Sequence, residues 1–309
     1  MRITLLFPAL AALALVCASP LQAETKKTLE ERIINYIEDE SYLVIDKAHC
    51  KDPLMQMVKD AYAGIRNSEV RGWAAALGCL DRFSYISPTP KRANPDGSAA
   101  VAPMIPDGGN TIEAWSTFGV RFVKLRSFTT GVAEKLLEAL EDTRSERLII
   151  DLRDNPGGWV DSLYRSVALF APHAGAPVTV STTRSDVTPK AAEARGPLAG
   201  HSIALLVNRN TASSAELFAG ILKYWGGKNV VIIGEKTFGK TVAQSCIVCD
   251  ESIRVLLTTK LIEVGSLDKR VPIQGIGIVP DILHVSAYGP VYSDSQLRLA
   301  LRYYGVLKE

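Results

Sequence analysis

The stretch from His201 to Gln244 contains two apolar runs separated by a helical pattern, and this arrangement limits the folds open to the chain. The first run, Ile203 to Val207, ends in the turn-forming triplet Asn-Arg-Asn. Apolar residues then recur at helical spacing until Gly226-Gly227, and a second run covers Val230 to Ile233. Short apolar strands joined by a helix are typical of parallel sheets.

The same alternation begins upstream. The pattern predicts a strand at Val120–Leu125, a helix at Val132–Leu140, a buried strand at Leu148–Ile150 and a helix from about Val160 to Phe170. A short terminal helix is expected at Leu297–Leu301. Strands and helices in alternation indicate an α/β core with a largely parallel sheet.

Composition sets wider limits. The chain has 309 residues, of which 47% are hydrophobic and 22% charged, enough for a core and a smaller second domain. Its formal net charge of +2 is close to balance, so it indicates neither a nucleic acid nor an anionic membrane surface as a partner.

Residues 1–23 have the composition of a secretory signal peptide. Arg2 gives a basic start, Leu5 to Val16 form an apolar run, and Leu21-Gln22-Ala23 resembles a cleavage site. The run is too short to favour a retained membrane span. Cys17 suggests a lipoprotein, but Val16 is bulkier than the small residue that such processing prefers. We therefore expect cleavage after Ala23 and a periplasmic or secreted protein.

Export changes the interpretation of the cysteines. Four remain after removal of the signal peptide, an even number in an oxidising compartment. We expect disulfides between Cys50 and Cys79 and between Cys246 and Cys249. Zinc binding fits poorly because Cys50 and Cys79 are far apart, and a redox role for the C-x-x-C pair is disfavoured in a β-hairpin. No metal site is predicted.

Three further segments follow the signal peptide. Residues 24–87 carry apolar residues at helical spacing and predict a small helical N-terminal domain. Residues 88–115 are rich in proline and glycine and predict a linker. Residues 116–309 form the predicted core domain.

The glycine-flanked lysine in GEKTFGKT, residues 234–241, has two interpretations. The segment satisfies the G-x-x-x-x-G-K-[ST] pattern of phosphate-binding loops. Such a loop needs a helix directly after the lysine, whose N-terminal amides meet the phosphates. Here Thr241–Val248 and Ile253–Thr259 predict a β-hairpin instead. This weighs against a P-loop NTPase.

The second interpretation pairs Lys240 with a serine. A serine hydroxyl becomes a good nucleophile only when a nearby base removes its proton. A lysine can serve if burial among apolar groups lowers the pKa of its amine, and Lys240 lies beside Phe238 between two apolar runs. Ser213 and Ser214 precede the predicted helix, a position where serines are most often N-caps.

Four motifs resemble those of the C-terminal processing (tail-specific) serine protease family. They are RLIIDLRDNPGGWV, NTASSAELFAG, GEKTFGKTVAQ and IQGIGIVPDI, in the family's order. The resemblance implies a crotonase/Clp-protease-like layered sheet core. Better-known members carry a PDZ domain where this chain has residues 88–115, a segment too short for a domain, so the chain resembles a PDZ-less variant.

The resemblance also implies roles for single residues. Counting back three positions from Glu216 makes Ser213 the nucleophile, with Ser214 left open as the alternative. Lys240 would be the base and Gln244 would orient its amine, since residues four apart on a strand share a face. The backbone amides of Gly158 and Ser214 would form the oxyanion hole. Gln244 could instead be a solvated strand residue. The closing motif, Val271–Asp281, is expected to pack near the site.

These observations predict an exported serine endopeptidase that hydrolyses polypeptides through an acyl-enzyme, with a Ser/Lys dyad assisted by glutamine and no cofactor. An activating partner or a homo-oligomer is left open. The alternative is a catalytically silent peptide- or ligand-binding protein on the same fold, because related folds host binders as well as enzymes.

Overall fold

The computed structural model describes residues 111–141, 147–248, 253–285 and 293–308, together with short strands at 75–76, 85–88, 91–93 and 99–101. The chain divides into two compact units, Met1–Pro90 with Ser245–Leu257, and Lys91–Gln244 with Thr258–Glu309. In the first unit, β1 (Ala75–Ala76) pairs antiparallel with β2 (Tyr85–Pro88), which pairs antiparallel with the beginning of β13 (Ile253–Gly265).

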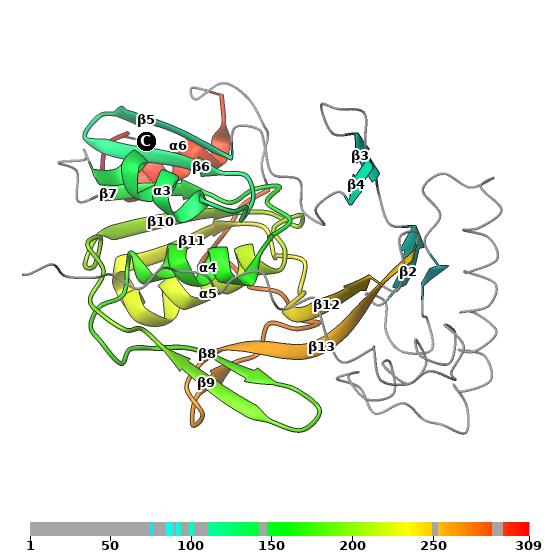
Figure 1. Cartoon of the computed structure of the whole chain (residues 1–309). Coiled ribbons are helices and arrows are strands. Elements are labelled where there is room, and N and C mark those ends of the chain that lie inside the picture. Colours follow the sequence, from blue (N-terminus) through cyan, green and yellow to red (C-terminus); the bar gives the residue numbers. More distant parts are fainter. Residues whose placement is uncertain are drawn as a thin grey trace, which may run out of the picture. The chain divides into compact units, whose positions relative to one another are not determined.

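A six-stranded sheet forms the centre of the second unit (Figure 1). Five of its strands are parallel, and β5 is antiparallel to β6 at one edge. The order across the sheet is β15 (Ile282–Leu283), β11 (Val230–Gly234), β10 (Ser202–Val207), β7 (Arg147–Asp151), β6 (Val120–Leu125) and β5 (Ile112–Thr117).

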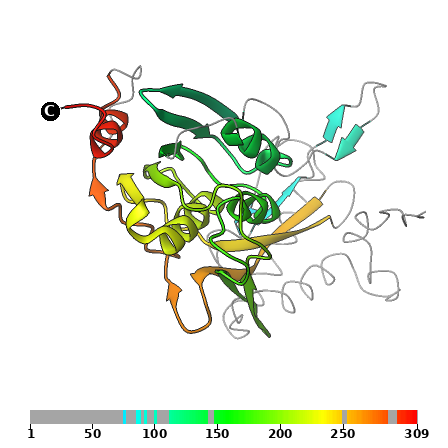
Figure 2. The same ribbon diagram turned by 90° about the vertical axis from the view of Figure 1, so that its left-hand side faces the viewer.

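Helices cover both faces of this sheet because successive strand side chains point to opposite sides. Leu205 and Ile150 belong to the core cluster that also contains side chains of α3 (Val132–Glu141), α4 (Val160–Ala168) and α5 (Ser214–Gly226). The neighbouring side chains Leu206 and Ile149 belong to a second cluster, with residues of α6 (Ser295–Tyr303). Figure 2 shows α6 on the opposite side of the sheet from the other helices.

A second, antiparallel layer lies against α4 and α5. It contains β8 (Pro177–Thr182), β9 (Val187–Ala191), the end of β13, and β14 (Arg270–Val271). Side chains of Val178, Ile262 and Val264 join the core cluster of α5, and Trp225 Nε1 donates a hydrogen bond to the carbonyl of Pro177 at 2.6 Å. α4 and α5 therefore lie between two sheets.

The predicted core elements are confirmed with small boundary shifts. The strands at Val120, Leu148, Ile203 and Val230 are β6, β7, β10 and β11, and the predicted helices are α3, α4, α5 and α6. The α/β core with its largely parallel sheet is therefore present. The hairpin expected after Lys240 is also present, since β12 (Val242–Val248) pairs with β13.

The region predicted as a linker, 88–115, contains more structure than expected. β3 (Lys91–Ala93) and β4 (Ala99–Val101) form an antiparallel pair, and β5 begins inside the predicted linker at Ile112. β1 and all of β2 except Pro88 lie in the range predicted as helical. β2 pairs with β13, more than 160 positions later, and local spacing carries no signal of such a distant partner.

Several expectations lie outside the described residues. These are the signal peptide, most of the helical N-terminal domain, and the side chains of all four cysteines assigned to disulfides. In the part of the chain that the structure does describe, no helix has the length and apolar character required to cross a bilayer.

We expect Phe218→Ala to lower the free energy of unfolding by about 3–5 kcal/mol. Phe218 is fully buried in α5 and packs against the rings of Phe128 and Phe170, with centroids 5.5 and 6.0 Å away. Phe118, which is 58% exposed, gives a matched control, and its replacement by alanine should change stability by less than about 1 kcal/mol. Urea unfolding of both variants measures this; equal losses would contradict the packing described.

Candidate active site

Three loops meet beyond the carboxyl ends of the neighbouring strands β7, β10 and β11. The loop after β10 leads to Ser213, which directly precedes α5. Its backbone has φ +57° and ψ −125°, outside the regions that non-glycine residues favour. Such strain persists only where neighbouring contacts hold it, and it is common at functional sites.

The loop after β7 forms the glycine turn. Buried Asn155 accepts a hydrogen bond from the amide of Gly157 at 2.8 Å and donates one to the carbonyl of Leu125 at 2.8 Å. Its own carbonyl accepts from the amide of Ala212 at 2.9 Å. Asn155 therefore fixes the glycine turn and attaches it to the residue before Ser213.

The glycine turn and the serine turn are in close contact. A Cβ atom on Gly157 would lie 2.7 Å from Ser213 Cβ and 2.8 Å from the amide nitrogen of Ser214, so no side chain fits there. The Ser214 hydroxyl donates a hydrogen bond to the carbonyl of Gly158 at 2.9 Å. Among the described residues, the amides of Gly158 and Ser214 donate to no protein acceptor.

The loop after β11 carries the lysine. Lys240 Nζ donates to Gln244 Oε1 at 2.9 Å, so the hydrogen bond expected between these two side chains is present. Both side chains are partly buried. A β-strand follows Lys240 where a phosphate-binding loop would require a helix, so the nucleotide-binding interpretation of GEKTFGKT lacks its structural context.

Glu216 joins the serine turn to the lysine loop. Its carboxylate, fully buried in the first turn of α5, accepts four hydrogen bonds. Oε2 accepts from the amides of Ser213 at 3.0 Å and Lys240 at 2.8 Å, and Oε1 accepts from the amide of Gly239 at 2.7 Å and the hydroxyl of Thr237. Because one oxygen atom binds both amides, the backbones of Ser213 and Lys240 lie within about two hydrogen-bond lengths of each other.

The environment of Glu216 has opposing effects on its acidity. Burial raises the pKa of the carboxyl above its ordinary value, because a charge is less stable away from water. The hydrogen bonds from Thr237, Lys240, Gly239 and Ser213 lower it and reduce that shift. Glu216 was not predicted to have this role. The pattern Ser-x-x-Glu at a helix start is typical of a capping box, in which the glutamate binds the backbone amide of the serine. This pattern could have predicted the contact between Glu216 and Ser213.

The closing segment packs beside the lysine loop, as predicted. Gln274 Oε1 accepts from the amides of Thr241 at 2.6 Å and Val242 at 3.1 Å. The amide of Gly275 donates to the carbonyl of Gly239 at 2.8 Å. The amide of Thr237 donates to the carbonyl of Ile278 at 3.1 Å. Gln274 was not predicted to have this role.

The described part of the chain contains no group of three or more His, Cys, Asp or Glu side chains that could hold a metal ion. Lys223, near the end of α5, donates to Asp281 at 2.8 Å and to the carbonyl of Val230 at 2.7 Å. Its amine is therefore engaged at the other end of the helix from Ser213.

Comparison with known proteins places the chain in a family. The chain is 29% identical over 166 residues to a carboxyl-terminal-processing protease of Synechocystis sp., and 30% identical over 171 residues to one of Bartonella bacilliformis. The alignments cover 52% and 53% of this chain but only 37% and 38% of those relatives. The chain thus matches well under half the length of either protein.

A solved structure shares the fold over a longer range. A lipoprotein from Streptococcus agalactiae superposes with a TM-score of 0.58 at 18% identity, covering 83% of this chain and 91% of that one. The sequence profile of peptidase family S41 matches residues 119–284, more than half of the 309 residues, and includes all three loops of the site. The chain belongs to peptidase family S41.

Proposed function

We propose that this protein is an exported serine endopeptidase that hydrolyses polypeptides through an acyl-enzyme formed on Ser213. The observation that carries the proposal is the shared carboxylate of Glu216, which binds the backbone amides of both Ser213 and Lys240, while Lys240 Nζ donates to Gln244. A nucleophile, a base and a group that orients the base are therefore joined by hydrogen bonds of about 3 Å.

The chemistry follows from these positions. Neutral Lys240 accepts the proton of Ser213 Oγ as that oxygen attacks the peptide carbonyl carbon. The resulting oxyanion accepts hydrogen bonds from the amides of Gly158 and Ser214. When the C–N bond breaks, the Lys240 ammonium returns the proton to the leaving amine. A water molecule then hydrolyses the acyl-enzyme, with Lys240 again acting as base.

Contacts at the glycine turn favour Ser213 over Ser214 as the nucleophile. The Ser214 hydroxyl is buried and donates to the carbonyl of Gly158, so it has a structural role. The same contact holds Ser214 next to Gly158, so the backbone amides of both residues can donate hydrogen bonds to one oxyanion. Gln244, whose side-chain oxygen accepts from Lys240 Nζ, holds the amine in one orientation.

The proposal includes several features beyond the site. They are export after cleavage behind Ala23, the disulfides Cys50–Cys79 and Cys246–Cys249, a domain at 24–87 that is helical apart from β1 and β2, and a layering of the crotonase/Clp-protease type. The helices that lie between two sheets in the core unit support that layering. The substrate is a polypeptide, and an activating partner or a homo-oligomer is compatible with the site. A catalytically silent binder on the same fold is the alternative.

We expect the purified protein to cleave casein and Ser213→Ala to reduce cleavage by about 10⁴-fold or more, to background. Lys240→Ala should have a similar effect, because it removes the base. Ser214→Ala is the matched control. It loses the bond to Gly158 but keeps its amide, so we expect activity within about tenfold of the parent.

Electrophoresis of timed digests measures these rates. Equal cleavage by the parent and Ser213→Ala would contradict the assignment of the nucleophile. Absence of cleavage by the parent protein, with or without added membrane and periplasmic extracts, would favour the binding alternative.

We expect Glu216→Gln to lower kcat by about a hundredfold with a smaller change in KM. Glutamine has the same shape, but its NH₂ group would face backbone amides that need an acceptor, so the serine and lysine loops would shift. Glu138→Gln, on the exposed side of α3, is the control and should leave both constants unchanged. A parental kcat in Glu216→Gln would contradict the role given to this carboxylate.

The same variant tests the raised pKa of Glu216. Because burial raises this pKa in the folded state, the folded protein binds the proton more tightly than the unfolded chain. The stability contributed by this group is complete below the ordinary glutamate pKa and is lost as the pH rises through the raised value. We therefore expect the difference in free energy of unfolding between the parent and Glu216→Gln to shrink as the pH rises from about 4. A difference that grows with pH would contradict this.

A further inference from the structure

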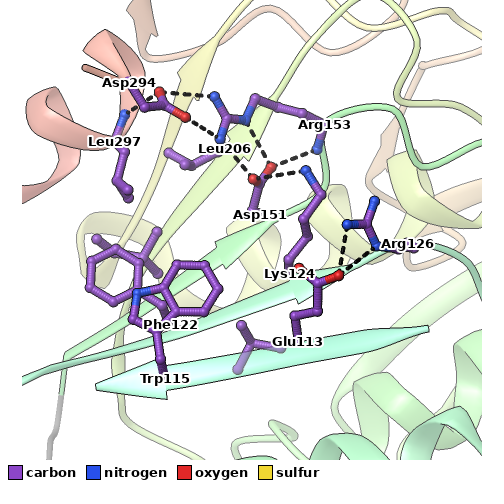
Figure 3. A pocket seen from close by; sticks show the side chains of 12 residues that line it. Glu113, Trp115, Phe122, Lys124, Arg126, Asp151, Arg153, Leu206, Asp294 and Leu297 are labelled. Carbon is purple, nitrogen blue, oxygen red and sulfur yellow. Dashed lines mark hydrogen bonds and ion pairs between the residues drawn. The ribbon is translucent and has the colours of Figure 1, made fainter. Parts of the chain in front are cut away.

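A cavity of about 280 Å³ lies on the sheet face that carries α6. Its walls come from β5, β6, β7, β10 and the start of α6, and none of the candidate catalytic residues lines it. Figure 3 shows aromatic rings on one side of this cavity and charged side chains on the other. The two sides have different chemistry, and together they restrict the kind of ligand that fits.

The aromatic side consists of Trp115 and Phe122, which are directly opposite each other on β5 and β6. Their ring centroids are 5.4 Å apart and their planes differ by 1°. Leu206 and Leu297 continue this surface into the cavity (Figure 3). Such a wall suits a flat ring or a branched apolar group.

Two carboxylates of the charged side, those of Asp151 and Asp294, are already satisfied. Arg153, whose side chain is only 4% exposed, contacts Asp151 at 2.7 Å and Asp294 at 2.7 Å through Nη2. Its Nε and Nη1 make further hydrogen bonds to the same two carboxylates. Asp294 also accepts hydrogen bonds from the backbone amides of Gln296 and Leu297 at the start of α6. These acids therefore offer little to a ligand.

Two cationic side chains of the cavity, Lys124 and Arg126, have N–H donors available for a ligand. Among the described residues, Lys124 Nζ contacts only Asp151 Oδ2, at 3.4 Å. Arg153 already binds that oxygen at 2.7 Å. An ammonium group has three donors, and the Lys124 side chain is only 18% exposed. Arg126 binds Glu113 through Nε and Nη2 at the cavity rim. In the described part of the chain neither cation has a second acceptor.

We propose that this cavity binds a carboxylate joined to an aromatic or branched apolar group. The carboxylate would accept hydrogen bonds from Lys124 and Arg126, and the apolar group would lie against Trp115 and Phe122. A single negative charge supplies the acceptors that the two cations lack, whereas Asp151 and Asp294 already accept hydrogen bonds from Arg153. The ligand could be the chain end of a polypeptide or a free aromatic acid, and these share the same chemistry.

Calorimetric titration with N-acetyl-L-phenylalanine tests the proposal, with the corresponding amide as the uncharged probe. We expect saturable binding of one acid per chain and at least about tenfold weaker binding of the amide. Lys124→Gln should weaken binding of the acid about tenfold or more, and Lys124→Arg should restore most of it. Lys135→Gln, on exposed α3, is the matched control and should bind as the parent does.

Three results would overturn the proposal: no saturable binding, equal affinity for acid and amide, or parental affinity in a folded Lys124→Gln protein. Ser213→Ala should bind the acid normally, and a loss there would place the ligand in the catalytic site instead. This separates failure of the cavity from failure of the proposed peptidase. Comparison of 3-phenylpropionate with a tripeptide ending in phenylalanine distinguishes the two sources: tighter binding of the tripeptide indicates a polypeptide chain end.

Discussion

The buried carboxylate of Glu216 is the interaction on which the geometry of the site depends. Glu216 lies one helical turn after Ser213 in sequence and more than 20 positions before Lys240. Its Oε2 nevertheless accepts hydrogen bonds from the backbone amides of both residues. Without it, three amides and the Thr237 hydroxyl would lose their acceptor inside the protein, where an unsatisfied donor costs about 1–3 kcal/mol each. The same anchor, with the glycine turn packed against Ser213, can maintain the left-handed backbone of that serine.

The parallel sheet explains why these loops meet at all. β7, β10 and β11 are neighbours with the same direction, so the loops that follow them leave from one edge. Sites in α/β proteins commonly form at the carboxyl ends of parallel strands for this reason. Each loop brings one component: the glycine turn its amides, the serine turn the proposed nucleophile, and the lysine loop the proposed base. The closing segment then binds the lysine loop through Gln274.

Sequence reasoning recovers the parts of this structure that are encoded locally. The strands and helices from Val120 to Ile233 follow from apolar spacing, and Lys240 and Gln244 converge because they are four apart on an extended segment. Contacts between distant segments were missed. The donors to Glu216 include amides from a loop that spacing cannot place beside it. β2 likewise pairs with a strand far along the chain. The buried Arg153 network likewise joins β7 to α6, 141 positions apart.

The most direct test of the account is to trap the acyl-enzyme and locate it. The protein would be mixed with an activated ester, quenched in acid, digested, and mapped by tandem mass spectrometry. The account predicts an acyl group on Ser213 in the parent protein, and a much lower yield in Lys240→Ala and in Glu216→Gln. An acyl group on Ser214, or equal yields in all three proteins, would contradict the assignment of Ser213, Lys240 and Glu216 to one catalytic arrangement.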